Sequence, residues 1–469
     1  MEPISDDALV LVAGYLGSRD VVALMRCCRQ LSATLGGTDA LWRGLLLRDY
    51  GVGDAAEMPP SKRQPEDPDF PADNASFRAA WRAWRGAFHG YDAALVRRFR
   101  TFWAGAREVF GREAPRVLDF LAPGATERKI NGLEVALRRH GAGRRLPDVL
   151  RVHLRFVDGQ DRGSGGRHSY AVGLPGAYWF YDQLVVGMLL SSDEMTLFTE
   201  QALRGDSGVQ SFRSHCPVVF YAGGHRFQMV EDAGEGGALG GNVSCHVLAP
   251  GVAARPSHPP SAAGDGLLVW LEQYLWRLRA GVFRFEQAPP HFDMDARIVS
   301  LFPRPPTDSP VPAEAAVYLD GQVTSRVTRG VRVDCSALMV PEQLAGGETL
   351  YAYSIRFEML ADHPSRPARL AQAQLATRHW RIKTTDPRTG RQNVESVDGD
   401  GVVGLYPIVS TAADAEPITY QSCSTASDDA NTAMGGFFVF VEGTRDAQTG
   451  PAFDVAVEPF LLKAPAFLY

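Results

Sequence analysis

The sequence predicts a multidomain chain, with an all-α unit, an α+β unit and an all-β unit in that order. Three observations predict this fold class. Apolar residues recur at helical spacing over residues 1–50, and the alternation typical of strands dominates residues 318–469. Two proline-rich segments, 51–76 and 302–317, read as linkers that set off a middle region at 77–288. The length of 469 residues suits about three domains at ~150 residues each.

The composition is that of an ordinary globular protein, with 45% hydrophobic and 22% charged residues. A net charge of -6 provides no basic field for binding a nucleic-acid backbone. The apolar runs are far shorter than the ~20 residues that span a bilayer. The start carries Glu2, Asp6 and Asp7 where a secretory signal carries basic residues. We therefore expect a protein of the cytoplasm or nucleus, with no nucleic-acid and no membrane partner.

The six cysteines are too sparse for a disulfide framework, and no two have the CxxC spacing of a zinc site. Thiols in this number are typical of a reducing compartment. They are Cys27, Cys28, Cys216, Cys245, Cys335 and Cys423.

The first fifty residues predict three helices, over 5–17, 18–37 and 38–51. Each begins at a serine or threonine and ends at glycine. A unit of this size is marginal alone, because its core is small. Several apolar residues also fall outside the main stripes, and this surplus predicts a partner that covers it. These residues are Val10, Leu11, Val22, Met25 and Leu47.

The middle region, 77–288, begins and ends with helical patterns around short strands and glycine-rich turns, which is typical of an α+β domain. Within it, the Pro/Ala/Gly-rich stretch 249–266 predicts a mobile loop.

The C-terminal region predicts antiparallel, half-buried strands in a β-sandwich. The alternation Tyr351, Tyr353, Ile355 and Phe357 places four apolar residues on one face. The clearest strands are 323–333, 349–360, 375–384, 402–409 and 436–442.

The most suggestive ligand motif is the GxGxxG string of residues 399–404. A dinucleotide site needs a helix after this motif, and Pro407 among β-forming residues excludes one. Two interpretations stay open. The amides around Gly399, Gly401 and Gly404 form an anion-binding loop, or the string is a tight turn between strands.

Other catalytic motifs have simpler interpretations. The string 205–208 (Gly-Asp-Ser-Gly) favours a surface turn, and adjacent His215 and Cys216 point to opposite faces of a strand. Residues 293–295 form a lone DxD, and no HExxH, EF-hand or P-loop occurs. The sequence therefore predicts no catalytic site, no metal site and no cofactor.

The residues also resemble known families. The first fifty positions resemble an F-box, although Pro3-Ile4 stands where the family usually has Leu-Pro. The resemblance rests on Pro3-Ile4, Leu9, Leu16, Asp20-Val21, Cys27-Cys28-Arg29 and Leu41-Trp42-Arg43.

Residues 77–288 resemble a SUKH domain of the ubiquitin-pathway type, through Gly132-Leu133-Glu134, Leu146-Pro147 and 156–160. Residues 318–469 resemble ApaG, whose family fold is a fibronectin type III-like sandwich. The matching motifs of that region are 351–356, Arg378-His379-Trp380, 399–404, 421–425, Met434-Gly435-Gly436 and Phe453-Asp454. The order F-box, SUKH, ApaG is that of F-box only proteins with an ApaG tail.

That resemblance implies a non-catalytic substrate receptor of a ubiquitin ligase. The F-box would bind a Skp-type adaptor, which joins a cullin–RING ligase, and the SUKH and ApaG domains would hold an unknown target protein. The alternatives are a phosphate- or nucleotide-binding activity of the ApaG domain and a scaffold without a ubiquitin connection.

Adaptor binding requires about half a dozen apolar anchors, because association costs ~4–15 kcal/mol and each buried Leu, Val or Ile returns roughly 1.5–3 kcal/mol. An alternative role for each anchor is packing inside the helical unit. The expected anchors are Pro3, Ile4, Leu9, Leu16, Val21, Leu24, Leu31, Leu41 and Trp42.

Overall fold

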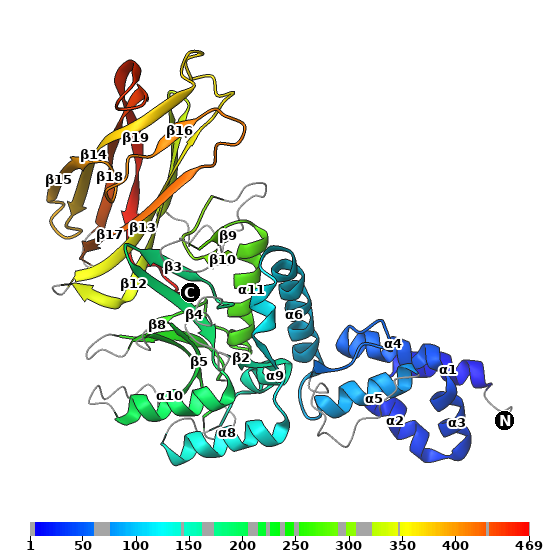
Figure 1. Cartoon of the computed structure of the whole chain (residues 1–469). Helices are drawn as coiled ribbons and strands as arrows, with labels where there is room; N and C mark the ends of the chain where they lie inside the picture. The colour runs from blue at the N-terminus through cyan, green and yellow to red at the C-terminus, as the bar shows by residue number, and fades with distance from the viewer. Residues whose placement is uncertain are drawn as a thin grey trace.

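The described part of the chain forms three regions in the expected order, with helices first and β-structure last (Figure 1). The predicted multidomain class, with N-terminal helices and a β-rich C-terminal region, is confirmed at this level. The computed structural model describes residues 5–60, 76–141, 145–161, 173–204, 214–221, 226–234, 240–247, 253–288, 297–305, 321–345, 348–427 and 431–468.

Four helices, rather than the three predicted, make up the N-terminal unit: α1 (Asp6–Tyr15), α2 (Ser18–Cys27), α3 (Arg29–Gly37) and α4 (Asp39–Tyr50). The trihelix prediction is wrong at Cys28, whose backbone is extended (φ -156°, ψ 164°). One extended residue interrupts the helical hydrogen bonds, so that α3 packs against α2 instead of prolonging it.

Helix α4 is the core of this unit and also its connection to the next. The Trp42 indole N–H donates to the Leu35 carbonyl at 2.8 Å, and its ring lies 5.1 Å from that of Trp81 on α5 (Phe77–Ala87). The preceding residues 51–60, expected to be linker, also pack here. Val52 is fully buried, and the Trp84 indole N–H donates to the carbonyl of Glu57 at 2.9 Å.

We predict that Trp42→Ala destabilises the protein by about 3–5 kcal/mol, because it removes a fully buried ring and one hydrogen bond. Leu47→Ala on the same helix is the control, since Leu47 is 53% exposed and its loss should change stability by less than about 0.5 kcal/mol. Calorimetric unfolding of the full chain measures both. Equal effects of the two substitutions would contradict the assigned packing.

The middle region places helices against a long sheet. Its helices are α5, α6 (Ala93–Glu113), α7 (Arg116–Asp119), α8 (Glu127–Arg139), α9 (Asp148–Phe156), α10 (Ser192–Arg204) and α11 (Gly266–Arg279). The sheet order is β8-β7-β6-β5-β4-β3-β10-β9, and β1 pairs with β2 in a separate two-stranded sheet. The strands are β1 (Leu121–Pro123), β2 (Val157–Gln160), β3 (Ala177–Phe180), β4 (Gln183–Leu189), β5 (His215–Tyr221), β6 (Arg226–Glu231), β7 (Val243–Val247), β8 (Arg255–Pro256), β9 (Arg284–Gln287) and β10 (Arg297–Ser300).

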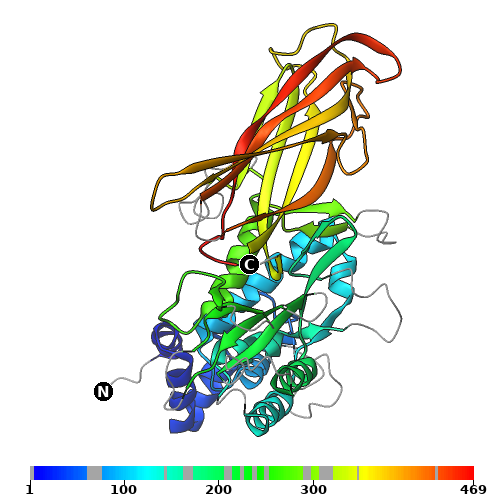
Figure 2. The ribbon, with the colours of Figure 1, turned by 90° about the vertical axis from the view of Figure 1, so that its left-hand side faces the viewer.

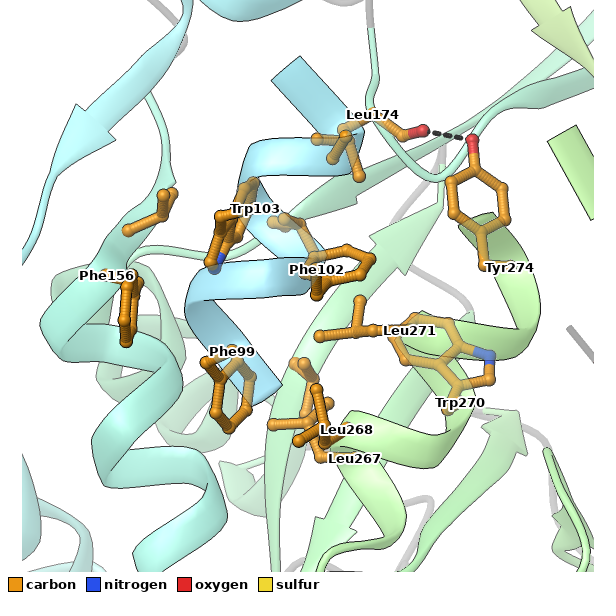
Figure 3. Close-up of a cluster of buried hydrophobic side chains, with 14 of the residues drawn as sticks. Phe99, Phe102, Trp103, Phe156, Leu174, Leu267, Leu268, Trp270, Leu271 and Tyr274 are labelled. Atoms are coloured by element: carbon orange, nitrogen blue, oxygen red, sulfur yellow. Dashed lines mark hydrogen bonds between the residues drawn. The ribbon is translucent and has the colours of Figure 1, made fainter. Parts of the chain in front are cut away.

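The core of the middle region lies where α6 and α11 run side by side (Figure 3). Phe102 extends from α6 toward Leu271 of α11, whereas the rings of Phe99 and Trp103 pack against α9. The Tyr274 hydroxyl of α11 donates to the carbonyl of Leu174. The mixture of helices and strands agrees with the α+β pattern, while the SUKH assignment itself stays a prediction.

Residues 253–266 differ from the expected mobile loop. Arg255–Pro256 form β8, which pairs with β7, and the side chains of Ser257 and His258 are buried. The backbone N–H of Val243 donates to His258 Nε2 at 2.9 Å. Buried polar side chains with partners of this kind hold the segment on the sheet, which composition alone did not reveal. Residues 249–252 lie outside the described part.

His153 of α9 is buried among aromatic rings, with centroids 6.0 Å from Phe99 and 5.9 Å from Trp103. Burial lowers the pKa of His153 from 6.5 to about 4, because the charged imidazolium is poorly solvated there. The folded state therefore holds the neutral ring, whereas the unfolded chain binds a proton below pH 6.5.

We predict that stability falls as the pH drops from 6.5 toward 4, since only the unfolded state gains the His153 proton over this range. The contribution is about 2 kcal/mol between pH 7 and pH 5. His153→Phe should remove this part of the pH dependence while keeping a ring of similar shape. Denaturant unfolding at the two pH values measures the difference, and an unchanged pH dependence in the variant would contradict the assignment.

The C-terminal region is a sandwich of two antiparallel sheets (Figure 2). The first has the order β11-β12-β13-β17, and the second has the order β15-β14-β18-β19, with β16 also paired to β14. The strands are β11 (Val323–Thr328), β12 (Val331–Ala345), β13 (Glu348–Met359), β14 (Gln372–Thr385), β15 (Gln392–Asp400), β16 (Ile408–Ser410), β17 (Ile418–Ala426), β18 (Asn431–Gly443) and β19 (Gln448–Leu462).

One predicted strand of the sandwich is a hairpin. Residues 323–333 were expected to be continuous, but the chain reverses at Arg329 and Gly330, which have φ values of 49° and 82°. Thr328 then pairs with Val331 across this two-residue turn. Apolar alternation continues on both sides of the turn, and for this reason the pattern read as one strand.

The sandwich is joined to the middle region through buried polar contacts. Glu342 of β12 accepts a hydrogen bond from the Tyr178 hydroxyl at 2.6 Å and forms an ion pair with buried Arg226 at 3.2 Å. Near the other end of the sequence, the Leu468 N–H donates to the Pro256 carbonyl at 2.9 Å, and Gln228 Nε2 donates to the Leu468 carbonyl at 2.8 Å. These contacts set the orientation of the sandwich on the middle region.

Candidate functional site

The most exposed apolar side chains of the N-terminal unit lie on α1 and α4. Leu11, Val12 and Tyr15 of α1 are 65%, 57% and 84% exposed, and Leu47 of α4 is 53% exposed. We call these four residues the apolar N-terminal surface. Leu11 and Tyr15 are one helical turn apart and therefore lie on one face of α1.

The packing of α1 explains this exposure. Ala13 is the one fully buried residue of α1 and Val10 packs partly against the core, while Leu11, Val12 and Tyr15 face outward. Arg48 Nη1 donates to the Leu16 carbonyl at 2.8 Å, which places the ends of α1 and α4 together (Figure 1). Exposed apolar side chains gathered at neighbouring helix ends are typical of a surface that another protein covers.

The structure assigns a different role to three of the predicted adaptor anchors. Val21, Leu41 and Trp42 are buried inside the unit and are not available to a partner. These predictions are corrected, because helical spacing marks an apolar stripe without saying which side of it faces the core. Leu9, Leu16, Leu24 and Leu31 are half-buried. Pro3 and Ile4 lie outside the described residues.

Val12 and Tyr15 were missed as candidates by the sequence reasoning. Neither residue is among the nine expected anchors or the surplus apolar residues named from the sequence. The sequence feature that could have indicated this surface is the surplus of apolar residues outside the main apolar stripe of each helix. That surplus includes Leu11 and Leu47, both of which are exposed.

The glycine string 399–404 is a tight turn after β15. Gly401, Val403 and Gly404 have φ values of 57°, 49° and 73°, and Val402 pairs with Leu405 in an isolated bridge. The amides of Gly401, Val402 and Leu405 donate to the carbonyls of Ala376, Leu405 and Val402. Since protein carbonyls occupy these amides, the geometry favours the turn over the anion-binding loop.

We predict that Gly401→Ala destabilises the sandwich more than Gly404→Ala does. A Cβ at Gly401 would lie 2.5 Å from the Leu405 carbonyl oxygen, whereas a Cβ at Gly404 has nothing within 4 Å. Both substitutions carry the cost of a positive φ, roughly 1 kcal/mol, and Gly401→Ala adds a clash with backbone. Denaturant midpoints of the two variants compare them, and an equal or reversed order would contradict this geometry.

The other sequence candidates for catalysis do not come together. The His215 ring lies beside that of His246, with centroids 5.0 Å apart, and Cys216 is buried, which raises the pKa of its thiol. Among the described residues, no group of three or more His, Cys, Asp or Glu side chains could hold a metal ion. In the same part of the chain, no helix has the length and apolar character needed to cross a membrane. Residues 205–208 and 293–295 lie outside that part.

Comparison with known proteins identifies relatives of the whole chain and of its sandwich. The F-box protein SKIP16 of Arabidopsis thaliana is 26% identical over 482 residues, covering 100% of both chains. Human F-box only protein 3 is 24% identical over 100% of this chain and 84% of its own length. A family model described as the ApaG domain matches residues 341–442. Protein ApaG of Pseudomonas entomophila is 32% identical over 98 residues, which are 21% of this chain and 67% of that protein.

The ApaG match lies within the sandwich, and the full-length relatives also align over the N-terminal helices with the exposed apolar surface. The chain therefore carries an ApaG domain in its C-terminal sandwich, and over its whole length it is similar to F-box proteins.

Proposed function

We propose that this protein is a substrate receptor of a Skp–cullin–F-box ubiquitin ligase. The N-terminal helices bind the Skp-type adaptor, and the middle region and the sandwich hold the target. The observation that carries the proposal is the apolar N-terminal surface, in a chain whose full-length relatives are named F-box proteins. Its role is to position a target lysine near a charged ubiquitin carrier, which is a proximity effect and requires no catalytic group here.

The energetics support adaptor binding at this surface. Each of Leu11, Val12, Tyr15 and Leu47 returns at most roughly 1.5–3 kcal/mol when a partner buries its exposed part, a sum within the ~4–15 kcal/mol range of the association cost. Half-buried Leu9 and Leu16 add to this area. All six cysteines are free, which agrees with a role in the reducing cytoplasm or nucleus.

We predict that Leu11→Asp and Tyr15→Asp each weaken binding of a Skp-type adaptor at least tenfold, because a carboxylate would be buried in an apolar interface. The fold should be unaffected, since both side chains are largely exposed. Calorimetric titration of the full chain with purified adaptor measures the affinity, and unfolding temperatures check the fold. Val394→Asp is the matched control, at an apolar side chain of the sandwich that is 55% exposed. Unchanged adaptor affinity in both α1 variants would refute the assigned surface.

The receptor role has a separate test. A Leu11→Asp/Tyr15→Asp double variant keeps the regions proposed to hold the target but cannot deliver it, so targets should accumulate on it in cells relative to the wild type. Quantitative proteomics of the two forms measures this difference. If the protein is instead a scaffold without a ubiquitin connection, the wild type and the double variant should carry the same partners in equal amounts.

A further inference from the structure

The two sheets of the sandwich are closed along one side. There, Thr324 Oγ1 of β11 donates to the Glu458 carbonyl of β19 at 2.9 Å, and Arg326 pairs with the Glu458 carboxylate at 3.0 Å. On the other side, β17 is the last strand of its sheet and β15 is the last strand of the facing sheet. A cavity of about 830 Å³ opens between these two edges.

The lining of this cavity shows which parts of the strands border it. Alternate residues of β14 and β15 contribute, so the inner face of that sheet forms the floor: Arg378, Trp380, Ile382, Thr384, Asn393, Glu395 and Val397. By contrast, consecutive residues 422–427 line the wall. Successive side chains of a strand point to opposite faces, so a consecutive run means that the edge of β17, with its backbone, borders the cavity.

Two polar groups in the cavity lining have no hydrogen-bond partner among the described residues. The Trp380 indole N–H and the Tyr420 hydroxyl are buried without a hydrogen bond in the described part of the chain, and the two residues are 3% and 6% exposed. Leaving such a group unpaired costs ~1–3 kcal/mol. A polar group of a bound molecule that reached the floor would remove this cost.

The charges around the cavity are mostly acidic. The residues that line it include the acidic Glu348, Glu395 and Asp400. The one guanidinium in the lining is that of Arg378, and its Nη1 already donates to the carbonyls of Asp400 and Gly401 at 3.2 and 2.9 Å. A basic occupant is therefore favoured over an acidic one. At the wall, Ser422 Oγ donates to the Tyr181 hydroxyl of the middle region at 2.8 Å.

We propose that this groove binds an extended polypeptide segment as an additional strand along β17. The segment places alternate side chains on the Trp380 and Ile382 floor, with a short hydroxyl or amide side chain near Tyr420 and a lysine or arginine near the carboxylates. A strand edge of six residues offers backbone donors and acceptors over ~20 Å, which an extended peptide matches and a compact small molecule does not. The inference rests on the proposed receptor function and names the class of target segment.

The test begins with a phage-displayed library of random 12-residue peptides, selected on the immobilised full chain. Selected peptides are synthesised, and their affinity is measured by fluorescence anisotropy. Glu395→Trp fills the groove and should weaken binding at least tenfold. Ser396→Trp is the control, because Ser396 neighbours Glu395 on β15 and points to the other face. Failure to select any peptide that is sensitive to Glu395→Trp overturns the proposal.

An N-methyl scan of the selected peptide tests strand addition itself. Methylation at every second residue should lower affinity tenfold or more, while methylation between these positions has little effect, because only alternate amides face β17. A scan without this period of two overturns the proposal.

Adaptor binding is measured on the same Glu395→Trp variant and should be unchanged. Loss of peptide binding with intact adaptor binding therefore leaves the receptor function standing, and intact peptide binding without adaptor binding refutes that function alone.

Discussion

Two sets of buried aromatic rings connect the N-terminal helices to the middle region, and the relative orientation of these two regions depends on them. The Trp42 ring contacts Trp81, and Tyr50 stacks on Trp84, whose ring leads through Phe88 to Phe156 at centroid separations of 5.8 and 5.0 Å. Because these buried rings are closely packed and cannot rotate independently, they fix the orientation of the N-terminal helices relative to the middle region. The proposed receptor role requires such a connection, since freely moving N-terminal helices would not hold a target at a defined distance from the adaptor.

The same packing decides which apolar residues stay available. Helix α4 directs its large side chains at α5, so Trp42 is unavailable to a partner, while α1 contributes a single buried alanine and leaves Leu11 and Tyr15 outside. At the far end, Glu342 and Leu468 join the sandwich to the middle region by buried hydrogen bonds. The N-terminal helices and the sandwich thus lie on different sides of the middle region, in both views (Figures 1 and 2). In the proposed function, a target segment bound to the sandwich would therefore lie away from the adaptor.

Several features followed from the residues directly. The glycine string 399–404 was predicted not to lead into a helix, because Pro407 follows it, and the structure has a turn there. The alternation around Tyr353 and Phe357 matches the strand β13. In each case a local rule, either the missing proline N–H or the period of two, suffices. The rule failed where one or two residues changed the backbone conformation, at Cys28 and at Arg329-Gly330, because the apolar pattern continues across both sites.

The sequence by itself determined the order of helical, mixed and β regions, the surplus of apolar residues near the N-terminus, and the absence of a dinucleotide fold at the glycine string. These depend on composition and periodicity within short segments. Only the tertiary structure decided which apolar residues face outward and where a cavity opens beside β17. Both are outcomes of packing between segments distant in sequence, and the periodicity of one segment contains no information about what lies against it.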